Sequence, residues 1–246
     1  MTAALYYVAP GTLDEVGAGS LVVLDGDEGH HAARVKRARV GEEMLVADTA
    51  GVVAHCCVES VGAGAVTLRV SSVRRVSPTG PRFVLVQALA KGGRDEQAIE
   101  TATELGVDAV LAWQAQRSVV RWSGKEAKGL AKWAGVLRTA GKQSRRATVP
   151  SVAGPLTTNE LAQRAAAAAA TYVLHEDAAA RLVAQDLPSA GEVLVVVGPE
   201  GGIAPDELDE LAEAGGSLVR LGDTVLRSSS AGPAALAVLN AQERWR

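Results

Sequence analysis

Hydrophobic and polar positions alternate in two different ways along the chain. Up to residue 75, apolar residues form short runs separated by glycine and polar residues, which is typical of strands. The predicted strands span residues 5–8, 20–24, 43–48, 51–59 and 65–73. Between the second and the third, Ala32, Val35 and Ala38 recur at helical spacing and predict a helix within 28–43. Short strands at this spacing predict a small barrel.

From residue 82 onward, apolar runs alternate with amphipathic segments. The runs predict buried strands at residues 82–89, 108–113, 171–176, 193–197 and 217–221. The amphipathic segments predict helices at residues 95–105, 125–144, about 158–170, from 205 onward, and 231–243. Trp133 and Leu137 lie on the inward face of the second helix, and Thr158 or Asn159 is expected to cap the third. Strands that alternate with helices predict an α/β domain built on a parallel sheet.

A boundary falls at residues 74–81, where two prolines and a glycine follow the last strand of the predicted barrel. Such a segment makes a short, fairly stiff linker. We therefore expect a β-barrel domain over residues 1–76 and an α/β domain over residues 82–246.

The strand at 193–197 ends at a glycine-rich turn, Gly198-Pro-Glu-Gly-Gly202. Pro205 then stands at a plausible first position of the next helix, with Asp206 and Glu207 in its first turn. The turn exposes backbone N–H groups and Glu200 at the carboxyl end of a strand, where open α/β sheets bind ligands. It matches neither a dinucleotide-binding fingerprint nor a phosphate-binding loop with its lysine. A tight strand–helix connection is an equally good interpretation of this spacing alone.

A second segment, Leu221-Gly-Asp-Thr-Val-Leu-Arg227, repeats the pattern of a short strand, a polar turn and an apolar helix. In a parallel sheet, the carboxyl ends of the strands before 175–176, 198–202 and 221–227 meet at one edge. We expect these three segments to form one site.

Several motifs together resemble a known family. They are GPEGG at 198–202, LGDTVLR at 221–227, KGGR at 91–94, TELGV at 103–107 and QSRR at 143–146. These motifs are similar to those of the SPOUT superfamily of methyltransferases and, more narrowly, of the bacterial family that methylates N3 of a uridine in 16S ribosomal RNA. The resemblance implies a PUA-like amino-terminal barrel and a carboxyl-terminal α/β domain with a trefoil knot.

The resemblance also implies a cofactor, S-adenosylmethionine, held in the knot. Leu221, Val225 and Leu226 can supply an apolar slot for adenine, and the glycines let the backbone approach the ligand closely. The implied cofactor-binding residues are Leu174, His175, Glu176, Gly198, Pro199, Glu200, Gly201, Gly202, Leu221, Gly222, Val225 and Leu226.

Methyl transfer to uracil N3 requires positioning and the loss of a weakly acidic proton. The candidate catalytic residues are Arg94, Arg145, Arg227 and Glu200. The arginines can orient a phosphate or stabilise developing negative charge. Glu200 can accept the proton or hold the methionine amine, and the sequence does not choose between these roles. The family usually has an acid where this chain has Ser229, so the identity of the base stays open.

Charge is segregated along a chain whose net charge is −3. Residues 113–146 contain nine Lys and Arg against one acid, whereas residues 176–223 contain eleven acids against two Arg. A concentrated basic stretch favours contact with a phosphate backbone, although a solvated helix face has the same composition. The residues expected to contact RNA are Arg34, Lys36, Arg37, Arg39, Arg117, Lys142, Arg145 and Arg146. Lys142 stands where the family usually has an acid.

Composition sets the remaining bounds. The chain has 246 residues, 48% hydrophobic and 22% charged, which is ordinary for a globular protein without membrane spans. The amino terminus carries no address signal, so we expect a cytoplasmic protein. Cys56 and Cys57 are strand neighbours that point to opposite faces, and the four histidines lack ligand spacing, so no metal is expected.

These observations favour an S-adenosylmethionine-dependent uracil-N3 methyltransferase that acts on 16S ribosomal RNA or the small ribosomal subunit as a homodimer. One alternative keeps the knot but transfers the methyl group to a ribose 2′-oxygen or to another base. The other is a non-catalytic RNA-binding protein, an alternative that only Lys142 and Ser229 favour.

Overall fold

The computed structural model describes residues 3–77 and 79–246, and their contacts divide the chain into two compact units. The first contains the chain up to residue 78 together with residues 141–149, and the second contains residues 79–140 and 150–246. No helix among the described residues is long and apolar enough to cross a membrane.

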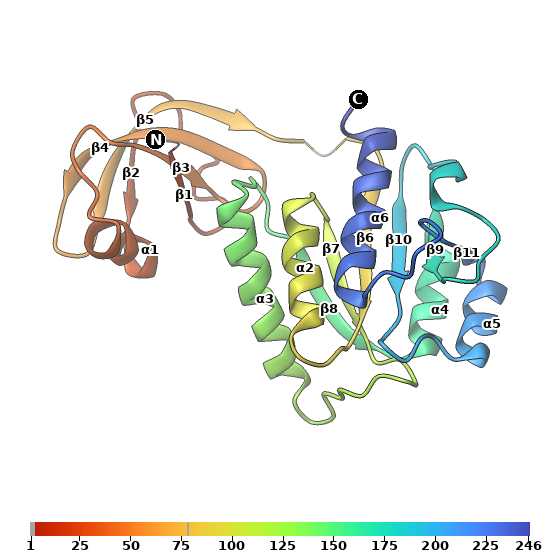
Figure 1. The fold of residues 1–246 in the computed structure, drawn as a ribbon. Coiled ribbons are helices and arrows are strands. Elements are labelled where there is room, and N and C mark those ends of the chain that lie inside the picture. The colour runs from red at the N-terminus through yellow and green to blue at the C-terminus, as the bar shows by residue number, and fades with distance from the viewer. Residues whose placement is uncertain (1–2, 78) are drawn as a thin grey trace. The chain divides into compact units, whose positions relative to one another are not determined.

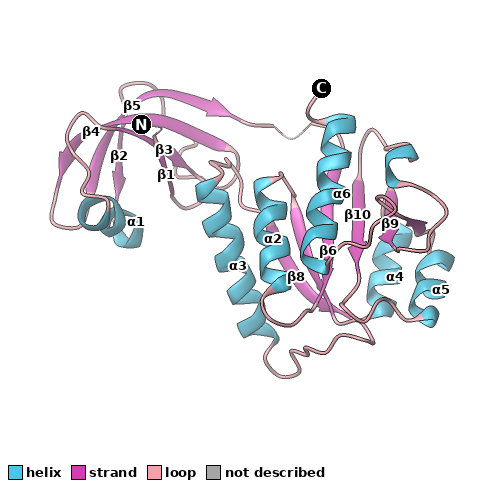
Figure 2. Ribbon diagram, viewed as in Figure 1, coloured by secondary structure: helices cyan, strands magenta, loops and turns pink. Residues whose placement is uncertain are grey.

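The first unit is a five-stranded mixed sheet (Figure 2). Its strands are β1 (Ala4–Tyr7), β2 (Leu21–Leu24), β3 (Glu43–Ala47), β4 (Val52–Val61) and β5 (Val66–Arg75). They pair in the order β1-β3-β4-β5-β2, in which only β1 and β3 run parallel. Tyr6 of the first edge strand and Leu24 of the other edge strand enter the same core. The sheet therefore curls around its core as the predicted barrel requires.

A short helical segment contributes to this core. It consists of α1 (Gly26–His30) and a π-helical turn, η1 (His31–Val35). Ala32 and Ala38 are buried as expected, but Val35 is 60% exposed, so its predicted place on the inward face was wrong. The N–H of Lys36 bonds to the carbonyl of His31, five residues back, and this wide turn breaks the regular helical spacing on which the prediction rested.

The basic segment 141–149 belongs to the first unit although it begins with the last residues of the long helix at Glu126–Gln143, most of which lies in the second. Ala147 is buried beside Tyr7, and the Tyr7 hydroxyl donates a 3.0 Å hydrogen bond to the carbonyl of Arg146. Lys142 forms a 2.7 Å ion pair with Glu28 and lies over the ring of Tyr6. Lys142 stands where the resembled family usually has an acid. Its charge is matched by Glu28 on α1.

The second unit is a six-stranded, all-parallel sheet in the order β11-β9-β10-β6-β7-β8. The strands are β6 (Arg82–Ala88), β7 (Ala109–Trp113), β8 (Ser151–Leu156), β9 (Ala170–Leu174), β10 (Glu192–Val197) and β11 (Ser217–Val219). The α/β fold class with a parallel carboxyl-terminal sheet is confirmed. The trefoil knot that the resemblance implies stays a prediction.

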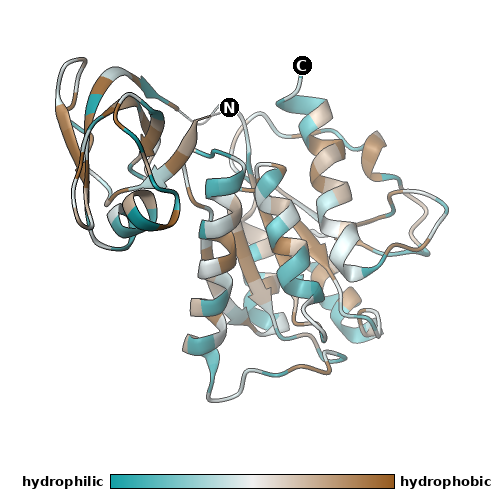
Figure 3. Ribbon diagram, turned by 60° about the vertical axis from the view of Figure 1, so that its left-hand side comes forward, coloured by the Kyte–Doolittle hydropathy of each residue, from teal (hydrophilic) through white to brown (hydrophobic). Residues whose placement is uncertain are grey.

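Helices cover both faces of this sheet (Figure 1). They are α2 (Arg94–Glu104), α3 (Glu126–Gln143), α4 (Thr158–Ala167), α5 (Pro205–Glu213) and α6 (Ser228–Glu243), with a short 3-10 turn, η2, at Leu182–Ala184. Helices α4 and α5 pack on the face that carries Val84 and Val86, whereas α2 and α6 pack on the other face. Figure 3 shows hydrophobic strands behind helices that carry both hydrophilic and hydrophobic positions. As predicted, Pro205 is the first residue of α5.

Four further local predictions differ from the structure. Strand β8 was missed because Gly154 and Pro155 interrupt its pattern, which an edge strand tolerates. The cap of α4 is Thr157, not Thr158 or Asn159, because Glu160 lies three residues after it and completes a capping box. Residues 221–227 form bends and coil instead of a strand, and α6 begins at Ser228 rather than near Ala231.

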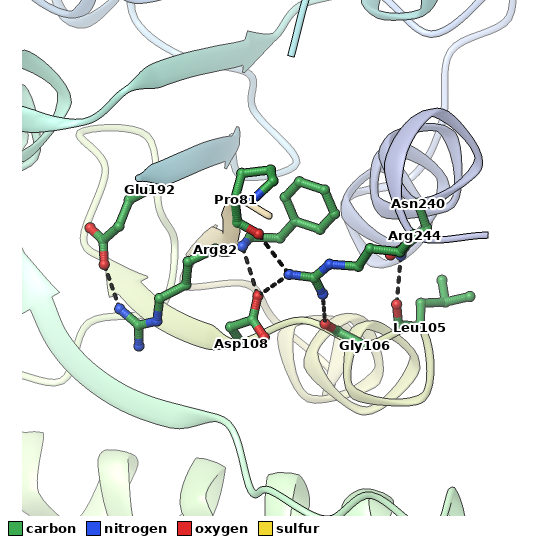
Figure 4. A network of polar contacts seen from close by, with 9 residues as sticks. Pro81, Arg82, Leu105, Gly106, Asp108, Glu192, Asn240 and Arg244 are labelled. Atoms are coloured by element: carbon green, nitrogen blue, oxygen red, sulfur yellow. Dashed lines mark hydrogen bonds and ion pairs between the residues drawn. The ribbon is translucent and has the colours of Figure 1, made fainter. Parts of the chain in front are cut away.

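The carboxyl end of α6 is fastened to the sheet by Arg244 (Figure 4). Its guanidinium donates to the carbonyls of Gly106 and Pro81, both at 2.8 Å, and pairs with Asp108 at 2.5 Å. It also stacks 4.2 Å from the ring centre of Phe83. The Asp108 carboxylate accepts the backbone N–H of Phe83 as well, so one cluster joins α6, the start of β6 and the α2–β7 turn.

Candidate active site

The carboxyl ends of β9 and β10 border a pocket of about 390 Å³. Its walls come from the loops after β9 and β10, from the coil before α6, and from Arg94 at the start of α2. A smaller cavity of about 100 Å³ lies between residues 174–176 and 219–226. Both cavities share Leu174, Val225 and Leu226, so they form one crevice at the sheet edge.

The turn after β10 is shaped by its glycines. A Cβ on Gly198 would lie 2.6 Å from Cγ1 of Ile203, which no side chain tolerates. Gly202 has a φ of +72° and its N–H bonds at 2.9 Å to the carbonyl of Pro199, which closes the turn. The glycines therefore allow the strand to reverse within five residues and leave Glu200 beside the pocket.

Glu200 is held by the loop after the neighbouring strand β6. Its carboxylate accepts a 2.8 Å hydrogen bond from the Arg94 guanidinium and a 3.2 Å bond from the backbone N–H of Lys91. Desolvation raises the pKa of Glu200, but hydrogen bonds from its own N–H, from Arg94 and from Lys91, with the charge of Arg94, outweigh it. The net pKa lies below the ordinary glutamate value. Glu200 is therefore an ionised group at neutral pH and a poor proton acceptor.

The lowered pKa of Glu200 predicts a pH dependence of folding. The ionised form is favoured by the fold, so its stabilisation is complete above the unfolded glutamate pKa of about 4.3 and is lost as the pH falls through the lower folded value. In urea unfolding at a series of pH values, the difference in stability between wild type and Glu200→Gln should shrink below about pH 4. Glu104→Gln, at an exposed position on α2, is the control. A difference that grows on acidification would contradict the assigned hydrogen bonds.

Arg227 and Ser228 form the wall of the pocket at the start of α6. Arg227 is exposed, and its guanidinium makes no hydrogen bond or ion pair within the described part of the chain. Arg227 does not pair with Glu200, because the Glu200 carboxylate bonds to Arg94 instead. Ser228 is buried, and its Oγ has no hydrogen-bond partner among the described residues. A free guanidinium at the pocket is available to a substrate.

The structure gathers most of the residues expected at the site. Every expected cofactor residue lines the crevice except Gly201, which is absent from its described lining. Of the catalytic candidates, Arg94, Glu200 and Arg227 line the pocket. Arg145 belongs to the first unit, where it is exposed and has a φ of +55°.

The residues expected to contact RNA divide between the units. Arg34, Lys36, Arg37, Arg39, Lys142, Arg145 and Arg146 all belong to the first. In that unit the Arg34 Nε donates to the carbonyl of Ala63, and Lys142 pairs with Glu28. Arg117 belongs to the second unit, where it bonds to the carbonyls of Gly201 and Ile203.

Sequence reasoning missed several lining residues. They are Val197, Ile203, Val219, Arg220, Asp223, Thr224, Ser228 and Ala231. Most of them lie within one or two positions of a predicted residue, so extending each motif by that much would have included them.

Asp223 forms ion pairs at the rim with Arg181 at 3.3 Å and with Arg220 at 3.7 Å, which the sequence pattern did not indicate. Among the described residues, no group of three or more His, Cys, Asp or Glu is arranged to hold a metal.

Two family models match the chain. An RNA methyltransferase domain matches residues 78–240, and an RNA methyltransferase PUA domain matches residues 24–71. Together with a crevice at the ends of parallel strands, these matches define the class as an RNA methyltransferase with a PUA domain.

Individual relatives narrow the class. The ribosomal RNA small subunit methyltransferase E of Mycobacterium tuberculosis is 49% identical over 251 aligned positions, which cover 100% of this chain and 94% of that protein. The Bacillus subtilis protein of the same name is 30% identical and covers 89% of each chain. A crystal structure of the Neisseria gonorrhoeae enzyme, bound to S-adenosyl methionine, has a TM-score of 0.86 at 25% identity and covers 98% of each chain. The chain belongs to the ribosomal RNA small subunit methyltransferase E family.

Proposed function

We propose that the protein transfers the methyl group of S-adenosylmethionine to N3 of one uracil in 16S ribosomal RNA. The observation that carries the proposal is a crevice whose lining combines the glycine turn, an ionised Glu200 and a free Arg227. Membership of the small subunit methyltransferase E family supports it.

The lining fits the cofactor in size and chemistry. The larger cavity, about 390 Å³, falls within the range that holds ligands of this kind. Leu174, Leu221 and Leu226 offer apolar walls for adenine, and Glu176 and Glu200 offer negative charge for a cationic ligand. When bound, S-adenosylmethionine supplies an electrophilic methyl group.

The chain itself contributes binding, orientation and charge. Arg94 fixes the Glu200 carboxylate at the pocket wall, so this acid holds positive charge instead of taking a proton. Arg227 is positioned to stabilise the uracil anion, and a guanidinium beside N3–H lowers the pKa of that group. With serine at position 229, the N3 proton leaves to solvent without a dedicated carboxylate base.

The first unit is proposed to position the RNA by phosphate contacts from its basic segments at 34–39 and 142–146. Because the proposed substrate of the protein is ribosomal RNA, the protein is proposed to act in the cytoplasm. Val225 and Leu226, 77% and 39% exposed, lie at the crevice and favour a homodimer in which a second copy covers this rim. Light scattering of the purified protein tests the dimer.

The function is tested by mass spectrometry of 16S ribosomal RNA from a deletion strain. We expect one N3-methyluridine to disappear and to return with the wild-type gene. Loss of a ribose 2′-O-methyl group or of another base methylation would favour the alternative chemistry. Unchanged RNA, together with no S-adenosylmethionine binding in calorimetry, would favour a binding protein without turnover.

A further inference from the structure

We propose that Arg117 is a positioning residue that fixes the shape of the glycine turn 198–203. This inference rests on the proposed function, because it assigns to Arg117 a role in holding the cofactor-binding loop. The sequence had placed Arg117 among the residues that contact RNA, and its contacts in the structure give it another task.

Arg117 bonds to the turn at two points. Its Nη1 donates to the carbonyl of Gly201 at 3.2 Å and to the carbonyl of Ile203 at 3.4 Å. These carbonyls flank Gly202, the residue with positive φ that lines the pocket. Arg117 is not among the described residues that line the crevice, so the contacts by which it can affect a cofactor bound there run through the turn.

The backbone of Arg117 is itself anchored. The N–H of its neighbour Gln116 donates at 2.8 Å to Glu207, a carboxylate that is only 3% exposed. Glu207 also accepts the hydroxyl of Thr158 at 2.7 Å and the N–H of Ala204 at 3.2 Å. A buried carboxylate is stable only when its oxygens are satisfied in this way. Glu207 thus ties the loop after β7 to the start of α5, next to the glycine turn.

The turn is therefore supported from the loops after β6 and β7, which lie with it at the same edge of the sheet (Figure 1). The loop after β6 holds Glu200 through Lys91 and Arg94, and the loop after β7 holds Gly201 and Ile203 through Arg117. Catalysis that depends on positioning requires such a rigid first contact with the cofactor. A loop of glycines has little rigidity of its own, so the support has to come from outside it.

The test compares Arg117→Met and Arg117→Lys with Arg164→Met, which removes a surface arginine on α4 that pairs with Glu192. Methionine keeps the apolar stem of Arg117 but removes the donors. Calorimetry should show S-adenosylmethionine affinity weakened roughly tenfold or more in Arg117→Met, as for lost hydrogen bonds to a charged group. Lysine should restore part of the affinity, and the control should bind like wild type.

Kinetics separate positioning from RNA contact. The KM for cofactor should rise in Arg117→Met, while the KM for RNA and the salt dependence of RNA binding stay at wild-type values. Wild-type cofactor affinity in Arg117→Met would overturn the proposal, and a salt slope reduced by about one would then assign Arg117 to a phosphate.

Hydrogen exchange tests the proposal if a variant does not fold or if the wild type does not bind the cofactor. If Arg117→Met does not fold, Arg117→Lys should still show faster exchange at the amides of residues 200–203 than wild type, and unchanged exchange would overturn the proposal. If wild type itself does not bind S-adenosylmethionine, the proposed function fails, but exchange in Arg117→Lys still decides whether Arg117 holds the turn.

Discussion

Arg227→Ala should lower the rate of methylation by roughly 100-fold, the effect expected for loss of a preorganised charge that acts in the transition state. The guanidinium lines the pocket and makes no hydrogen bond or ion pair among the described residues. Its removal therefore leaves the fold intact, and S-adenosylmethionine affinity should stay within a few-fold of wild type. The rate falls because the uracil anion loses its positive neighbour.

Single-turnover methylation of the RNA substrate with saturating enzyme and cofactor measures this effect without product release. Arg164→Ala is the matched control, since Arg164 is an exposed arginine on α4, away from the crevice, that pairs with Glu192. A parallel fall in melting temperature and cofactor affinity in Arg227→Ala would show that the residue holds the loop instead. A fully active variant would remove Arg227 from the mechanism.

The sheet of the second unit could be predicted because its strands are buried on both faces. Val193 to Val197 are all buried between helices, so the sequence there is an unbroken apolar run with little ambiguity. The strand ends then located the crevice, since parallel strands present their carboxyl ends at one edge. The sequence pattern alone therefore indicates the glycine turn and the Leu221–Arg227 segment as parts of the site.

The parts that the sequence did not reveal depend on contacts between distant residues. Strand β8 lies at the sheet edge, where pairing with β7 decides its structure and Gly154 and Pro155 hide its pattern. The segment 141–149 packs in the first unit because Ala147 is buried there and Lys142 pairs with an acid there. Neither contact can be recognised from the local sequence. A pattern along one segment cannot show which of two cores that segment joins.

The same limit applied to the charged residues of the site. A count of basic residues placed Arg117 with the RNA contacts, whereas its bonds run to carbonyls more than eighty residues later in the chain. The sequence also left two roles open for Glu200. Its hydrogen bonds to Arg94 and Lys91 lower its pKa and favour the role of a fixed negative charge.

Arg244→Ala should cause the largest loss of stability, about 2–4 kcal/mol, because it breaks a partly buried ion pair and two further charged hydrogen bonds. Among the described residues, that carboxylate oxygen of Asp108 then keeps only the N–H of Phe83 as a partner, and the ring of Phe83 loses its stacked cation. For a chain of this size each 1 kcal/mol corresponds to about 2–4 °C in melting temperature, so scanning calorimetry should show a clear fall.

Arg246→Ala, which replaces an exposed arginine two residues further on, is the control and should change stability by less than about 0.5 kcal/mol. Arg244→Lys should recover little, since one ammonium cannot reach two carbonyls and a carboxylate with the geometry of the guanidinium fork. Equal melting temperatures for Arg244→Ala and Arg246→Ala would show that α6 is held by its apolar packing on α2 and β10 alone.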